Sequence, residues 1–286
     1  MVRALRDSIR QLHTDPDEIL EIASLYYETL FTSDPFQDVQ DAKDEVWSFV
    51  RPMDGDAFTL RQGRPITLMS SVYKILARMI SARLRPFLPD LIHSSQTGFV
   101  QDRNILDNLV TFYEAVEWAR QTKQPTGIML LDFEKAYDRV DSEFLEGTLS
   151  RMGFPHAWIM EISALYGSTT VAVTISGHVG RSFTLSRSVR QDCPLAPYLF
   201  LFFVETMALY LRGRTPQIQG LQMPIDGSPD LVEQEYVDDT MIFFQYEFDT
   251  LDRLQCTLSV FYCANGFLIT WHKSSGFVIV VDDVCR

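Results

Sequence analysis

The chain has 286 residues, of which 46% are hydrophobic and 22% are charged. This length is enough for one large domain or two small ones with a buried core, and the apolar fraction excludes a fully disordered chain. The formal net charge of −13 argues against a protein whose whole surface binds nucleic acid. The charge is unevenly placed, because residues 61–130 carry nine basic and five acidic residues between two acidic stretches. A basic block of this size is more often a solvated face than a polyanion site.

The cysteines and the N-terminal segment narrow the class further. Four cysteines fit neither a disulfide framework nor the paired spacing of a metal site, so free thiols in a reducing compartment are expected. The opening MVRALRDSIRQLH is charged and amphipathic, which predicts no secretory signal there.

The first half of the chain predicts three helices. Asp15-Pro16 is typical of a helix start, because Asp can cap the helix and Pro suits its first position. Residues 33–64 are rich in Asp, Pro and Gly and predict a loop. A second helix is expected from Ser70-Ser71 to Pro86, with an apolar face along it, and a third over about residues 105–121.

From Gly127 onwards strands alternate with helices. A short apolar run over 128–131 predicts a buried strand that ends at Asp132, and a helix is expected over 142–152. Alternation over 171–175 with a glycine-flanked turn predicts a hairpin that returns near Phe183. Two apolar strands flank Asp238-Asp239, and a further helix follows over about 251–261. Helices that alternate with short hairpins indicate the α+β class.

Residues 195–211 are almost wholly apolar and have two interpretations. A membrane span needs about 20 such residues without a charge near the middle. This segment has 17 residues, with Glu205 inside it and Pro197 near its start. A buried core helix is therefore the better prediction, and no membrane partner is expected.

Three carboxylates stand out by their places in these elements. Asp132 ends a buried strand, while Asp238 and Asp239 form the tip of an apolar hairpin. A carboxylate there must be solvated, paired or bound to a cation, and hard cations such as Mg²⁺ prefer oxygen ligands. Two such ions can clamp the attacking and leaving oxygens of a phosphoryl transfer. The plainer interpretation is that Asp-Asp is an ordinary turn dipeptide and that Asp132 caps the next helix.

Longer motifs surround these residues and carry a resemblance. In chain order they are RPITL from Arg64, QTGFVQDRNILDN from Gln96, LLDFEKAYDRV around Asp132, RSVRQDCPLAP around Gln191, EYVDDTMIF around Asp238, and ANGFLITWHKS through Lys273. Together, and at these separations, they resemble the reverse transcriptase of non-LTR (LINE-type) retrotransposons over about 64–275.

The resemblance implies a right-hand polymerase palm, an antiparallel sheet with packed helices, plus partial fingers and no thumb. It implies an N-terminal helical or linker segment over 1–60, fingers over 61–126 and a palm over 127–286. The implied partners are an RNA template, a DNA primer and deoxynucleoside triphosphates, and fingers that touch phosphates would give the basic block a reason. The implied cofactor is a pair of Mg²⁺ ions, which Mn²⁺ could replace.

The resemblance also assigns roles. Asp132 and Asp238 would bind the two metals with Asp239 beside them, and the carbonyl of Phe133 would contact the second metal. The remaining assignments concern the nucleotide: Arg64 grips the triphosphate, Tyr137 disfavours a 2′-hydroxyl, Gln191 lies near the incoming nucleotide, and Lys273 donates a proton to the leaving pyrophosphate. Taken alone, each of these four would be an ordinary core or surface residue.

Four departures from the family pattern predict impaired activity. Asp192 and Ser188 stand where the family has glycines that allow a close backbone approach. By comparison with the family, we expect a finger block before Arg64, and the thumb that follows the Lys273 motif in the family, to be missing. The alternative is therefore a non-catalytic remnant or a nucleic-acid-binding module. An unrelated two-metal phosphohydrolase ranks last, because the five histidines show no ligand spacing near the aspartates.

Overall fold

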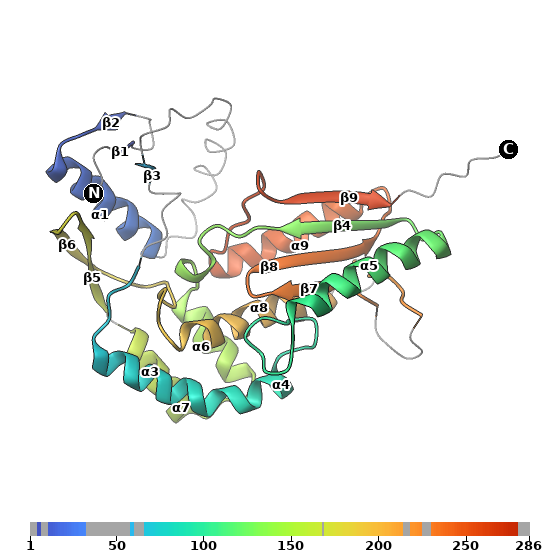
Figure 1. Ribbon diagram of the computed structural model, residues 1–286, viewed down its shortest axis with the longest axis horizontal. Coiled ribbons are helices and arrows are strands. Elements are labelled where there is room, and N and C mark those ends of the chain that lie inside the picture. Colours follow the sequence, from blue (N-terminus) through green and yellow to red (C-terminus); the bar gives the residue numbers. More distant parts are fainter. Residues whose placement is uncertain are drawn as a thin grey trace. The chain divides into compact units, whose positions relative to one another are not determined.

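The computed structural model describes residues 5–6, 11–32, 58–59, 66–167, 169–213, 218–224 and 230–279 (Figure 1). The helices are α1 (Pro16–Phe31), α3 (Ser71–Leu84), α4 (Leu88–Leu91), α5 (Ile105–Thr122), α6 (Ser142–Arg151), α7 (His156–Tyr166), α8 (Ala196–Arg212) and α9 (Thr250–Asn265). Short 3-10 turns are η1 (Arg85–Phe87) and η2 (Ala136–Asp138). The strands are β1 (Leu5–Arg6), β2 (Leu12–His13), β3 (Phe58–Thr59), β4 (Thr126–Leu131), β5 (Thr170–Ile175), β6 (His178–Thr184), β7 (Glu233–Tyr236), β8 (Asp239–Gln245) and β9 (Ser275–Ile279).

The chain divides into two compact units, each built from two stretches. One unit comprises residues 1–70 with 137–193, and the other comprises residues 71–136 with 194–286. The sequence predicted three segments, 1–60, 61–126 and 127–286, from the roles that the resemblance implies. The division into compact units does not test those roles, so the three segments stay a prediction.

The second unit is organised around a four-stranded sheet in the order β7-β8-β4-β9, with every neighbouring pair antiparallel. Ile128 of β4 pairs with Phe243 of β8, and both pack against the buried alanines Ala115 and Ala119 of α5. These small side chains let the helix lie close on one face of the sheet. α9 passes behind the strands in Figure 1, and α8 packs against α9.

α8 confirms the prediction of a buried core helix. Most of its apolar side chains are buried, and the Phe203 ring centroid lies 4.9 Å from that of Phe267 and 6.0 Å from that of Phe261 on α9. Aromatic burial of this kind is a large favourable term for a core. Within the described ranges, no helix is long and apolar enough to cross a membrane.

The first unit packs α1 against the β5-β6 hairpin. Asp15 caps α1 as predicted, because its side chain accepts hydrogen bonds from the amides of Asp17 and Glu18. The Phe31 ring of α1 stacks on Phe183 of β6 with centroids 6.4 Å apart, within a cluster of buried apolar residues. The α6 and α7 helices also contact each other in this unit.

Most predicted elements are confirmed. The short elements α4, β1, β2 and β3 were not predicted, and neither were α7 and β9, which lack a clean apolar period. The predicted apolar face of α3 is mostly exposed, since Val72 and Met79 are solvent-accessible while Ala77 and Leu84 are buried. The loop predicted over 33–64 lies outside the described residues except for β3.

Candidate active site

The Asp238-Asp239 pair forms the tip of the β7-β8 hairpin. Tyr236 pairs with Asp239 across the two strands, so Val237 and Asp238 alone make the turn. Val237 has a φ of 59°, in the left-handed region that a β-branched side chain rarely adopts. Such a conformation costs roughly 1–2 kcal/mol and persists only where surrounding contacts hold it. The acidic turn is therefore strained at the residue just before its carboxylates.

Asp132 lies at the same end of the sheet as this turn. The β4-β8 ladder ends with Leu131 opposite Thr240, so one further step along both strands sets Asp132 opposite Asp239. The Thr270 amide donates to the Asp132 carbonyl at 2.7 Å, and the Asp132 amide donates to the Ser274 hydroxyl at 3.1 Å. The backbone of Asp132 is thus fixed between a sheet and the loop that precedes β9.

Two further predicted site residues come from the same unit. The Lys273 ammonium lies 4.0 Å from a carboxylate oxygen of Asp132, and the two side chains are 64% and 41% exposed respectively. The Phe133 ring is buried, and its centroid lies 4.6 Å from that of Phe267. The strand register and the Lys273 distance therefore place Asp132, Asp239 and Lys273 at the end of the sheet where the turn carries Asp238, and Phe133 follows Asp132 with its ring in the core.

This edge suits a hard cation that keeps most of its ligands from solvent or substrate. The side-chain donors are carboxylate oxygens, and Asp132 remains 41% exposed. Across the ranges that the structure describes, no group of three or more His, Cys, Asp or Glu side chains could hold a metal ion. Mg²⁺ is commonly bound by one or two carboxylates with waters and phosphates completing its shell, so the donor set fits that ion.

The other unit contains Tyr137 and Gln191. The Gln191 side-chain amide donates to a carboxylate oxygen of Asp138 at 3.0 Å, and the Val189 amide donates to the Tyr137 carbonyl at 3.0 Å. Asp138 is buried, so it anchors Gln191 in a fixed orientation. Sequence analysis missed Asp138, although it stands one residue after Tyr137 within the same motif. Arg64 lies outside the described residues.

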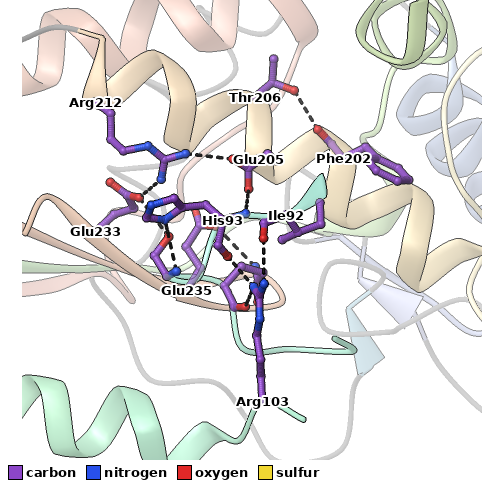
Figure 2. Close-up of polar contacts among 11 residues, drawn as sticks. Ile92, His93, Arg103, Phe202, Glu205, Thr206, Arg212, Glu233 and Glu235 are labelled. Carbon is purple, nitrogen blue, oxygen red and sulfur yellow. Dashed lines mark hydrogen bonds and ion pairs between the residues drawn. The ribbon is translucent and has the colours of Figure 1, made fainter. Parts of the chain in front are cut away.

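A second acidic cluster, also missed from the sequence, is buried beside the β7-β8 hairpin (Figure 2). Glu233 and Glu235 of β7 are 2% and 0% exposed, and Glu205 of α8 is 4% exposed. The Arg212 guanidinium lies 2.8 Å from a Glu205 oxygen and also contacts Glu233. Burial raises the pKa of all three carboxyls, and that of Glu235 stands well above its ordinary value because Glu233 and Glu205 add repulsion.

The loop between α4 and α5 closes this cluster. The His93 amide donates to a Glu205 oxygen at 3.0 Å, and the Ser95 hydroxyl donates to Glu233 at 3.0 Å. The pKa of His93 is lowered, first by burial and then by the nearby Arg212 charge. In the sequence, the sign of this buried cluster is the alternation of Glu233 and Glu235 just before the acidic turn. That alternation does not tell which face of β7 is buried.

A cavity of about 450 Å³ adjoins the acidic turn through Tyr236. Aromatic side chains of Phe99, Tyr198 and Tyr236 line it together with the basic Arg85 and Arg103. Sites for single-stranded nucleic acid usually combine aromatic rings, on which bases stack, with positively charged side chains that pair with phosphates.

The family model for reverse transcriptase (RNA-dependent DNA polymerase) matches residues 56–281 of this chain. The match covers more than half of the chain and includes Asp132, Asp238 and Asp239, which we call the acidic edge. The chain belongs to the reverse transcriptase family.

Curated relatives place this reverse transcriptase chain among retrotransposon proteins. It is 34% identical over 229 residues to the "Transposon TX1 uncharacterized 149 kDa protein" of Xenopus laevis, a match covering 79% of this chain and 17% of that protein. It is 26% identical over 179 residues to the "Retrovirus-related Pol polyprotein from type-1 retrotransposable element R2" of Popillia japonica, covering 61% and 25% respectively. These matches confirm the resemblance to non-LTR elements, and this chain spans a quarter or less of each relative.

A solved structure confirms the polymerase fold. Apo telomerase from Candida tropicalis, truncated from its C-terminal domain, superposes with a TM-score of 0.51 at 14% identity. The match covers 89% of this chain and 46% of that one. With an antiparallel sheet and packed helices, this reverse transcriptase chain has the α+β class that the sequence predicted.

Two departures from the family pattern fall on left-handed residues of the reverse transcriptase chain. Ser188 has a φ of 103° and Asp192 a φ of 71°, and these are the positions where the resemblance predicted glycine. Glycine adopts such angles without penalty, whereas other residues pay roughly 1 kcal/mol or more. The Ser188 hydroxyl accepts a hydrogen bond from the Arg190 amide at 2.9 Å, which offsets part of that cost. The chain therefore keeps the glycine-type backbone after losing the glycines.

Proposed function

We propose that this chain is the polymerase portion of a non-LTR retrotransposon protein, and that it adds deoxynucleotides to a primer 3′-hydroxyl against an RNA template. The observation that carries the proposal is the β4-β8 register, which continues to Asp132 opposite Asp239 beside the strained turn that holds Asp238. Three carboxylates at one open edge of a sheet suit the transfer of a phosphoryl group between oxygens.

The chemistry at this edge is mainly positioning and charge neutralisation. Two Mg²⁺ ions, or Mn²⁺ in their place, would be held by Asp132 and Asp238, with Asp239 and the Phe133 carbonyl beside them, and would supply the positive charge that the reacting phosphate needs. The chain itself holds the carboxylates at fixed separation through β4 and β8, so little reorganisation accompanies the reaction.

The remaining predicted residues act on the nucleotide. Lys273 lies 4.0 Å from Asp132 and is proposed to donate a proton to the leaving pyrophosphate. Gln191, oriented by Asp138, is proposed to lie near the incoming nucleotide, with Tyr137 excluding a 2′-hydroxyl. Arg64 is proposed to grip the triphosphate, since a guanidinium is a planar and permanently charged donor.

RNA binding is proposed to use the cavity next to Tyr236, because it joins aromatic rings to the exposed basic side chain of Arg85. We further propose that polymerisation is weak, because Ser188 and Asp192 occupy backbone positions suited to glycine. Asp192 also adds a negative charge next to Gln191, where a triphosphate would approach. The same departures favour the second candidate, a nucleic-acid-binding remnant without catalysis.

Primer extension on an RNA template tests these proposals. We expect slow, Mg²⁺-dependent incorporation by the wild type and a roughly 100- to 1,000-fold loss in Asp238→Asn, by analogy with removal of one transition-state stabiliser. Asp252→Asn is the matched control, since Asp252 is exposed on α9. Asp192→Gly should raise incorporation. Salt-dependent RNA binding with no incorporation in the wild type or in Asp192→Gly would replace the polymerase with the binding module.

A further inference from the structure

Gln96 lies against the strand that leads into the acidic turn. It forms a parallel bridge with Glu235 of β7, in which the Thr97 amide donates to the Glu235 carbonyl at 3.0 Å and the Glu235 amide donates to the Ser95 carbonyl at 2.9 Å. The Gln96 side chain is almost fully buried, at 1% exposure. A segment before α5 thus continues the sheet beyond β7, beside the hairpin tip.

The Gln96 side-chain amide forms hydrogen bonds with both the backbone amide and the backbone carbonyl of Val237, the left-handed residue of the turn. Its oxygen accepts hydrogen bonds from the Val237 amide at 2.9 Å and the Gly98 amide at 2.8 Å. Its nitrogen donates to the Val237 carbonyl at 3.3 Å and to a Glu235 carboxyl oxygen at 3.4 Å. A primary amide has two donors and one oxygen with two lone pairs, so Gln96 uses its whole capacity here.

Sterics provide an independent sign that this contact is specific. A Cβ placed on Gly98 would lie 2.5 Å from a methyl carbon of Val237 and 2.7 Å from its amide nitrogen. Real Cβ atoms do not approach that closely, so only glycine lets the 96–98 segment reach Val237. The close approach and the hydrogen bonds fall on the same residue of the turn.

The 96–98 segment is itself rigidly mounted. The Arg103 guanidinium donates to the backbone carbonyls of Pro89, Ile92, His93 and Gln96, and Figure 2 shows Arg103 reaching back toward Ile92 and His93. The Asn108 side chain on α5 donates to the Glu235 carbonyl at 2.9 Å. A side chain on a rigid segment can hold a strained residue in its conformation, whereas one on a mobile segment could not. We call the hydrogen bonds from Gln96 to Val237 the clamp.

We propose that Gln96 is a positioning residue that holds Val237 in its left-handed conformation and so sets the direction of the Asp238 and Asp239 carboxylates. The catalytic part of this inference rests on the proposed polymerase function. Gln96 touches neither the carboxylates nor a substrate, and it acts through the backbone of Val237. Sequence analysis placed Gln96 in a family motif but gave it no role.

Amide hydrogen exchange in the full chain tests the clamp without any catalysis. In Gln96→Met, exchange of the Val237 amide should become about tenfold faster, which corresponds to one lost hydrogen bond. In Gln96→Glu, which keeps an acceptor but loses both donors, the acceleration should be smaller. The Phe243 amide, which donates to the Val232 carbonyl within the sheet, should not change. Gln121→Met on the exposed face of α5 is the matched control.

Kinetics test the positioning role. We expect Gln96→Met to lower kcat by roughly 10- to 100-fold with little change in KM, as for a misplacement of the reacting groups. Val237→Gly should restore much of that loss in the double variant, because glycine adopts the left-handed conformation without a clamp. A merely stabilising role for Gln96 predicts no such rescue, so failure of Val237→Gly to restore kcat would overturn the proposal.

The two proposals can fail separately. If Val237 exchange is unaffected by Gln96→Met in a folded chain, the clamp is wrong whatever the activity. If Gln96→Met does not fold, Gln96→Glu and Gly98→Ala still test the clamp, since both should speed Val237 exchange ahead of Phe243. If the wild type and Asp238→Asn incorporate nothing while Val237 exchange responds as expected, the polymerase proposal fails and the clamp stands.

Discussion

Two acidic clusters each include residues of the β7-β8 hairpin, and they differ in burial and in the partners of their carboxylates. In the acidic edge, Asp132 with Asp238 and Asp239, the first two residues are half-buried and Asp239 is exposed. The acidic core, Glu205 with Glu233 and Glu235, is buried between β7 and α8 around Arg212. Only Tyr236 and Val237 lie between Glu235 and Asp238 along the chain.

The difference shows that solvation decides whether a carboxylate is available to bind a cation or serves to stabilise the fold. At the edge, water can stabilise each charge, so the carboxylates remain able to exchange water for a cation. In the core, a charge has no water and depends on Arg212 or on taking up a proton. Two members of the core cluster belong to β7, the strand that leads into the acidic turn, and Gln96 contacts both Glu235 and the turn. The edge is thus suited to chemistry, and the core to holding the strand in place.

Removing the shared cation of the acidic core should have the largest effect. Arg212→Met leaves Glu205 and Glu233 buried without their partner, which usually costs roughly 3–5 kcal/mol. Urea denaturation should show this loss in the free energy of unfolding. The control is Arg181→Met, which breaks an exposed ion pair with Glu28 and should cost below about 1 kcal/mol. Equal losses in the two variants would mean that burial does not distinguish the core cluster.

The sequence predicted the acidic edge but not the acidic core, for a physical reason. Asp132 and Asp238 end apolar strands and sit within motifs, so local pattern alone singles them out. Glu233 and Glu235 alternate on a strand in the way that solvent-facing residues do. Their burial depends on α8 and on the loop before α5, whose packing no local pattern encodes.

The same limit explains what was predicted of the fold. The start of α1, marked by a cap, was predicted correctly, and both ends of α5 were predicted to within one residue. The loop at Ser188 and Asp192 was flagged through its missing glycines, but its left-handed backbone is visible only in the structure. Gln96 was likewise invisible, because a polar residue in a motif does not reveal that its partner is a backbone amide 141 residues away.

A smaller effect is expected from neutralising one member of the acidic core. The folded state keeps the Glu235 carboxyl protonated above its ordinary pKa of 4.5, because burial and then Glu233 and Glu205 raise its pKa. The unfolded chain releases that proton, so stability falls as pH rises through and above 4.5. Glu235→Gln mimics the protonated form and keeps an oxygen to accept from Gln96.

We therefore expect Glu235→Gln to stabilise the fold by on the order of 1 kcal/mol at pH 7, or a rise in Tm of about 2–4 °C. The gain should shrink as the pH falls toward 4. Thermal melts across this pH range measure it, with the exposed Glu114→Gln as control. A gain that stayed constant with pH would show that Glu235 is ionised in the fold, which would make the acidic core resemble the edge.

The smallest effect on stability is expected at the acidic edge itself. Lys273 lies 4.0 Å from Asp132, and both side chains are well exposed, so solvent screens the pair. Lys273→Met should change the free energy of unfolding by less than about 1 kcal/mol, the usual range for surface pairs. Urea denaturation measures this, and any accompanying loss of kcat in primer extension would then report on the loss of the Lys273 ammonium from the reaction instead of on stability. A stability loss above about 2 kcal/mol, beyond what an exposed pair supplies, would mean that the edge is held together by its charges. In that case the edge would depend on ion pairing as the core does, and exposure would no longer separate the two clusters.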